Sequence, residues 1–182
     1  MKKEVKKEEY AIVLDFLPTG DPLKNITNPV IYSIGTNYFT LLLLSPKPGV
    51  KVDVFEEVYI GDGPRPKIKS ILKRLSLNDL TLIARENLEK AIYMILEKKE
   101  QEFVNFFNTA GPLNIRVHTL QLLPNIGKKV LENILEEREK EPFKSYKDIE
   151  ERVKGIKDVK KILYERILKE LSGEEKTKLF TI

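Results

Sequence analysis

The chain contains no cysteine and no tryptophan, and only one histidine among its 182 residues. Without cysteine it cannot form a disulfide framework, a cysteine-rich zinc site, an iron–sulfur cluster or a thiol nucleophile. Lack of disulfides is typical of proteins from a reducing compartment. We therefore expect a cytoplasmic protein that carries no metal or other cofactor.

Long apolar runs are also missing. The longest, residues 39–44, is far shorter than the roughly 20 residues that a membrane span requires. Residues 1–10 form a charged mixture without the apolar core of a signal peptide. The net charge of +4 is too small to indicate a nucleic-acid partner by itself. With 41% hydrophobic residues the chain can build a core, so we expect a soluble globular protein without a membrane partner.

The first part of the chain has a β pattern. Short apolar runs cut by Gly, Pro and Asn predict strands at residues 10–17, 30–34, 38–45, 51–60 and 68–75. About five strands in so short a segment suit a small closed barrel better than an open sheet, whose edges would need cover. The pattern favours an oligonucleotide/oligosaccharide-binding (OB)-like β-barrel over residues 1–78.

The spacing of the apolar residues becomes helical after Asn78-Asp79, which we predict to be a helix cap. Apolar residues then recur with helical spacing at Ala84, Leu88, Ala91, Ile92, Ile95 and Leu96. A second helix with Phe103, Phe106 and Phe107 on its packing side should end near Gly111-Pro112. Residues 79–112 thus read as a helical connector, and the fold class is α+β, a barrel followed by an all-α domain.

Residues 115–140 predict a helix, a tight hairpin and a second helix. The hairpin is similar to the core of the helix-hairpin-helix motif, Leu-Pro-Gly-Ile-Gly followed by a basic residue, with Asn125 at the first glycine. Small residues let the backbone approach a phosphate, and free N–H groups at the start of the next helix attract the anion. The candidate contacts here are Asn125, Ile126, Gly127, Lys128, Lys129 and, on the preceding helix, Arg116.

A degenerate copy of this pattern follows 30 residues later, after a helix that Ser145 and Asp148 should open as a capping box. Gly155 and Lys157 are its candidate phosphate contacts, and packing against the first copy is the other interpretation. Residues 113–182 are therefore predicted to form a tandem helix-hairpin-helix domain with a short C-terminal tail.

Several segments together resemble the archaeal family catalogued as domain of unknown function 655. They are Val58–Gly61, Leu80-Thr81, Phe103–Ala110, Arg116, His118, Leu122–Pro124, Ile126–Lys129, Phe143 and Glu151–Val153. Asn125 departs from the family, which usually has Gly at this position. The resemblance implies an OB-like barrel followed by helices with a helix-hairpin-helix unit, and nucleic-acid binding. It also implies a link to ribosomal RNA or transcription, because the family's genes often lie beside those for a ribosomal RNA dimethyltransferase and an RNA polymerase subunit.

The barrel offers a second set of candidates. Three basic residues, Arg65, Lys67 and Lys69, lie in or just after the Gly- and Pro-rich loop 61–67. They either contact the phosphate backbone of a nucleic acid or belong to an ordinary solvated turn. Tyr38 and Phe39 either form a base-stacking platform or pack in the core of the barrel. For Phe39 we favour core packing, and for Tyr38 both interpretations stay open.

These observations lead to a non-catalytic protein that grips the phosphate backbone of RNA or DNA. One alternative is a protein-interaction scaffold whose hairpins only pack. The other is a nucleic-acid-processing enzyme. Helix-hairpin-helix glycosylases place a catalytic Asp at about the distance after the hairpin at which Asp148 stands here. The chain lacks the large helical fold that forms the base pocket of those enzymes. The sequence leaves the oligomeric state open.

Overall fold

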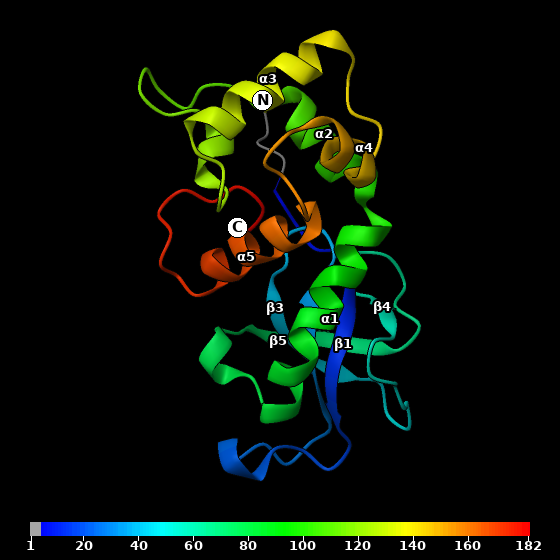
Figure 1. The fold of residues 1–182 in the computed structure, drawn as a ribbon. Helices are drawn as coiled ribbons and strands as arrows, with labels where there is room; N and C mark the ends of the chain where they lie inside the picture. Colours follow the sequence, from blue (N-terminus) through cyan, green and yellow to red (C-terminus); the bar gives the residue numbers. More distant parts are fainter. Residues whose placement is uncertain (1–4) are drawn as a thin grey trace. The chain divides into compact units, whose positions relative to one another are not determined.

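The computed structural model describes residues 5–182 and has a five-stranded antiparallel sheet followed by helices (Figure 1). The strands are β1 (Tyr10–Leu17), β2 (Val30–Gly35), β3 (Leu41–Pro46), β4 (Glu57–Tyr59) and β5 (Ile68–Arg74). The helices are α1 (Leu82–Lys98), α2 (Glu100–Thr109), α3 (Lys128–Lys140), α4 (Tyr146–Arg152) and α5 (Val159–Leu171). Short 3-10 helices are η1 (Pro22–Lys24), η2 (Leu77–Asp79) and η3 (Thr119–Leu122). The α+β class is confirmed.

The strands form one curled half-barrel in the order β4-β1-β2-β3-β5. Irregularities in register, between Val13 and Asp15 in β1 and twice along the β3–β5 pair, add twist and curvature to the sheet. Apolar side chains on the inner face build its core. They are Ala11, Val13, Ile31, Leu42, Leu44, Val52, Val58, Ile60 and Ile68. The predicted barrel-like N-terminal sheet is confirmed, with β4 and β5 as edge strands of the part that the structure describes.

Two predicted boundaries of this region were wrong. The strand predicted at 51–60 shrinks to β4, because a turn closed by Glu56 N–H donating to Asp53 C=O, with Phe55 at a φ of 70°, precedes it. The cap of α1 is Thr81 rather than Asn78-Asp79: its Oγ1 accepts the N–H of Ala84 at 3.0 Å and donates to Asp15 of β1 at 2.6 Å. The helix start is thereby tied to the sheet.

The chain divides into two compact units. One contains the residues up to Ile92 together with Lys169–Ile182, and the other contains Tyr93–Leu168. The apolar stripe predicted for the first helix is buried in α1, from Ala84 to Leu96. No helix of residues 5–182 is long and apolar enough to cross a membrane.

Candidate nucleic-acid interface

The first hairpin, Leu123–Gly127, joins η3 to α3 in the helical unit. Leu123 and Ile126 are buried, with exposed fractions of 2% and 4%, and anchor the hairpin in the core. Asn125 lies between them at the exposed tip with a φ of 62°, the left-handed region that asparagine tolerates better than other non-glycine residues. Asn125, which stands where the motif usually has Gly, therefore preserves the turn.

Gly127 is the N-cap of α3, and it has no side chain with which to cap the helix. The first N–H groups of an α-helix have no partner within the helix, so this end presents backbone donors and the positive end of the helix dipole. Lys128 and Lys129 follow at once and are exposed; Lys129 lies 4.0 Å from the exposed Glu132, a weak surface pair. The helix start thus combines open donors with two cations.

The fold itself gives no reason for a glycine at position 127. Its backbone has a φ of −85° and a ψ of −170°, which any residue adopts, and a Cβ built there would meet no atom within 4 Å. Gly155 is different, because its φ is 103° and a Cβ would lie 2.8 Å from the Cγ2 of Val130. Both the backbone conformation and the packing therefore favour glycine in the second hairpin, whereas in the first hairpin it only leaves open space.

The second hairpin packs against α3. Besides the contact of Gly155 with Val130, the Nδ2 of Asn133 donates to the carbonyl of Lys154 at 2.9 Å. Val153 and Ile156 are buried like their counterparts in the first copy. This copy is thus held by the first one, and Lys157 is exposed beside it.

The start of α5 is occupied by carboxylates of the chain itself. The Oδ1 of Asp158 accepts the N–H of Lys161 at 3.1 Å, and the Oε2 of Glu150 accepts the N–H of Val159 at 2.9 Å. Lys160 is paired with Glu97 at 3.1 Å. A phosphate arriving here would meet negative charge and donors already in use. The two hairpins therefore differ at the position where an anion would bind: carboxylates occupy backbone donors at the start of α5, whereas no side chain caps the start of α3.

The helix predicted at 115–123 is wrong: only η3 forms, and Arg116 belongs to a loop. Asn114 Oδ1 accepts the N–H groups of Arg116 and Val117, at 2.8 and 2.9 Å, and a β-bridge joins Pro112 to His118. Such side-chain bonds to the backbone compete with helix formation. Arg116 is exposed on this loop, which precedes the first hairpin.

His118 positions η3. It is buried, and its Nδ1 accepts the N–H of Leu120 at 3.1 Å while Gln121 Oε1 accepts the N–H of His118. Burial, with a smaller contribution from the Arg138 guanidinium, lowers the pKa of the imidazole below its ordinary value. The histidine thus caps the element that leads into the hairpin.

Asp148 is part of the helix cap that was predicted with Ser145. Ser145 Oγ accepts the N–H of Asp148 at 2.9 Å, and the carboxylate of Asp148 accepts the N–H of Lys144 at 2.9 Å and pairs with Arg152 at 3.1 Å. The Lys144 N–H, with a smaller contribution from Arg152, lowers the pKa of this carboxyl. Among residues 5–182, no three acidic or histidine side chains gather in an arrangement that could hold a metal ion.

The basic residues predicted on the barrel lie in the other unit, and two of the three are engaged. The Nε of Arg65 donates to the carbonyl of Gly61 at 2.9 Å, and Lys67 pairs with Glu56 at 2.8 Å. Lys69 is exposed on β5. Phe39 packs in the core, as the sequence predicted; its φ is 57° and its exposed fraction is 1%.

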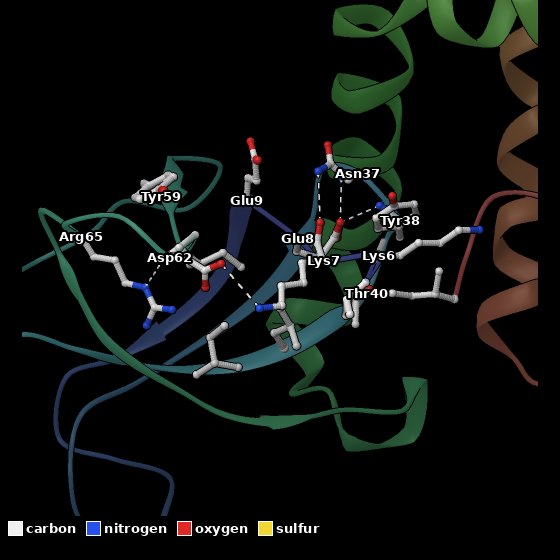
Figure 2. A pocket seen from close by; sticks show the side chains of 16 residues that line it. Lys6, Lys7, Glu8, Glu9, Asn37, Tyr38, Thr40, Tyr59, Asp62 and Arg65 are labelled. Atoms are coloured by element: carbon white, nitrogen blue, oxygen red, sulfur yellow. Dashed lines mark hydrogen bonds and ion pairs between the residues drawn. The ribbon is translucent and has the colours of Figure 1, made fainter. Parts of the chain in front are cut away.

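A pocket of about 820 Å³ in the same unit is lined by Tyr38, Arg65 and residues of both charges (Figure 2). Glu8 Oε1 accepts the N–H groups of Asn37 and Tyr38, at 2.9 and 2.7 Å, and so holds the β2–β3 turn that forms part of its wall. An ion pair between Lys7 and Asp62, 3.5 Å long, joins two of its lining residues. This mixture of charges favours phosphate less than the start of α3 does.

One feature of the sequence could have defined the candidate interface more fully. Residues 103–131 contain neither Asp nor Glu, although the chain has 28 of them, and they contain Arg116, Lys128 and Lys129. The segment includes the loop 112–118 and the whole first hairpin. The exposed Leu113 and Ile115 of that loop were missed, because their side chains look like core residues in the sequence.

Comparison with known proteins gives three matches. The model of a family described as "Protein of unknown function (DUF655)" matches residues 7–182. The uncharacterized protein MJ0038 of Methanocaldococcus jannaschii is 41% identical over 178 residues, which are 98% of this chain and 81% of that protein. The crystal structure of Af1531 from Archaeoglobus fulgidus, with the same family assignment, is 40% identical and superposes with a TM-score of 0.88 over 96% of this chain and 100% of that one.

Proposed function

The chain belongs to the DUF655 family, whose description names no function, and from the geometry of its first hairpin we propose that it binds the phosphate backbone of nucleic acid without catalysis. The observation that carries the proposal is the start of α3, where open backbone donors, a bare Gly127 and two exposed lysines meet. Residues 103–131 contain neither Asp nor Glu, and Glu132, which follows them, is exposed and pairs only weakly with Lys129. A helix N-terminus of this kind favours a phosphate oxygen.

The contrast between the two hairpins supports an asymmetric interface. Asp158 and Glu150 occupy the start of α5, whereas Gly127 leaves the start of α3 open. The second hairpin therefore serves to hold the first, and the backbone contacts come from Gly127–Lys129 and the adjoining Arg116. Backbone contacts carry no base information, so binding should tolerate a wide range of sequences. Both RNA and DNA present the required phosphates.

The proposal is tested by the salt dependence of binding. Each phosphate that a protein neutralises adds about 0.7 to 0.9 to the slope of log K against log salt, so Lys128→Ala with Lys129→Ala should reduce that slope by about 1 to 2. The matched control is Lys154→Ala with Lys157→Ala, which removes the same charge from exposed positions of the second hairpin.

Fluorescence anisotropy with single-stranded, duplex and hairpin RNA and DNA provides the measurement. We expect the first double variant to weaken binding to all of them by a similar factor, and the control to change the slope much less. Equal slopes for the wild type and the first double variant would refute the hairpin as the binding element. Binding of protein partners by that variant and the wild type alike would then favour a scaffold.

A further inference from the structure

The loop 112–118 is folded on itself and presents apolar side chains to solvent. The N–H of Leu113 donates to the carbonyl of Val117 at 2.9 Å, and Asn114 holds the turn through the N–H groups of Arg116 and Val117. At its tip the Ile115 side chain is fully exposed, and Leu113 is 47% exposed. An ordered loop thus displays two large apolar groups on either side of Asn114, next to a cation.

Neither side chain belongs to the buried core. Single exposed apolar residues are common on protein surfaces, but here two occur in one loop whose conformation is set by its own hydrogen bonds rather than by burying them. The loop also lies within the segment 103–131, which has no acidic residue. An exposed loop that combines apolar tips with an arginine, in a segment without Asp or Glu, suits a polyanion with apolar groups between its charges.

The loop lies close to the first hairpin. It ends at His118, and η3 alone, four residues long, leads from there to Leu123. A 3-10 helix rises about 2 Å per residue, so η3 spans about 8 Å. About that distance separates the end of the loop from Leu123, the first residue of the hairpin, and both belong to the unit Tyr93–Leu168. We therefore treat the loop and the hairpin as parts of one binding surface.

We propose, on the basis of the proposed backbone binding, that loop 112–118 is an apolar wedge that inserts Ile115, with Leu113 beside it, between adjacent base pairs of a duplex. Leucine and isoleucine are among the side chains that proteins insert into base steps from the minor groove, where they unstack the step and kink the duplex. Arg116 then faces the phosphates that flank the opened step. Pyrimidine–purine steps such as TA unstack most easily, so the wedge selects flexible steps rather than a base sequence.

The test uses 2-aminopurine, whose fluorescence rises when its base is unstacked. Three duplexes of equal length carry it: DNA with one central TA step, DNA with an A-tract in place of that step, and RNA with the sequence of the first. The variants are Ile115→Ala and, as the matched control, Leu23→Ala, which shortens a side chain that is 96% exposed in η1. Both positions are exposed, so thermal stability should not change.

We expect the wild type and Leu23→Ala to raise the fluorescence of the TA duplex and to bind it about fivefold more tightly than the A-tract duplex. Ile115→Ala should lose both effects and keep the salt slope of the wild type. A rise with RNA as well would also support the wedge and show that both polymers accept it.

Two results would overturn the wedge in distinguishable ways. The loop is not a wedge if Ile115→Ala binds and unstacks the duplex like the wild type, or if the wild type binds without any fluorescence change. In that case a salt slope that depends on Lys128 and Lys129 would still uphold backbone binding. The wedge is also refuted if the wild type binds none of the duplexes at low salt. If the wild type binds no single-stranded or hairpin nucleic acid either, backbone binding is refuted with it.

Discussion

Replacing Gly127 by Asp should make the protein more stable and a weaker nucleic-acid binder. Position 127 is the N-cap of α3, its φ of −85° and ψ of −170° suit any residue, and the space for a Cβ is open. An aspartate there would cap the N–H groups of the first turn, as Asp158 does at the start of α5. The substitution thus gives the first hairpin the charge pattern of the second.

The gain in stability has three sources. The cap hydrogen bond contributes a few tenths of a kcal/mol over glycine, the carboxylate adds about 0.3 to 1 kcal/mol at the positive end of the helix dipole, and loss of glycine's freedom in the unfolded chain adds about 0.4 to 1 kcal/mol. The free energy of unfolding should therefore rise by about 1 to 2 kcal/mol. Binding should weaken about tenfold or more, because a charge-assisted hydrogen bond to phosphate is worth about 1.5 to 3 kcal/mol.

Urea unfolding followed by circular dichroism measures the first quantity, and anisotropy at fixed low salt measures the second. Lys154→Ala is the control, since it changes the net charge by the same amount on the second hairpin and should weaken binding only slightly. Gly127→Ser, which caps without charge, should lie between the wild type and the aspartate variant in affinity. An aspartate variant that is more stable but binds as tightly as the wild type would refute the reasoning, because the helix start would then not contact the ligand.

Three further predictions concern stability. Asn125→Ala should lower the free energy of unfolding by about 1 kcal/mol and Asn125→Gly should leave it nearly unchanged, because alanine is strained at a φ of 62°; equal effects in urea unfolding would contradict this. Gly155→Ala should cost about 2 to 3 kcal/mol, from a φ of 103° and the clash with Val130, and a variant as stable as the wild type would show that the second hairpin is not packed on α3. The pKa of His118 is lower in the folded protein than in the unfolded chain, so the unfolded chain takes up this proton first as the pH falls. The free energy of unfolding should therefore be full above about pH 6.5 and decrease below it. His118→Asn keeps a cap without titrating and should lose less stability between pH 7.5 and 5, and an identical loss would exclude this histidine as a cause.

Local patterns predicted much of the fold. The apolar stripe of α1 from Ala84 to Leu96 follows directly from helical periodicity, and the strands β1, β2, β3 and β5 follow from short apolar runs bounded by Gly, Pro and Asn. Predictions failed where a side chain or an unusual φ redirects the backbone. Asn114 and His118 turn residues 113–118 into a loop, and the turn around Phe55 shortens β4.

The first hairpin could be located from its sequence, including the left-handed turn at Asn125, because the motif is local. The difference between the two hairpins could not. It depends on Glu150, which comes from α4 to accept the N–H of Val159, and on the close approach of Gly155 to Val130. Such contacts join residues that no periodic pattern relates, so only the three-dimensional arrangement distinguishes a hairpin that is open to an anion from one that is closed.

Backbone amide chemical shifts in an NMR titration test the central claim most directly. With a short duplex added at low salt, the account predicts large shifts for the amides of Gly127, Lys128 and Lys129, with small shifts for those of Lys157–Lys160, and a reversal of the shifts when salt is raised. Shifts that are equal at the two helix starts, or that are absent from Gly127–Lys129 while binding is detected, would contradict it.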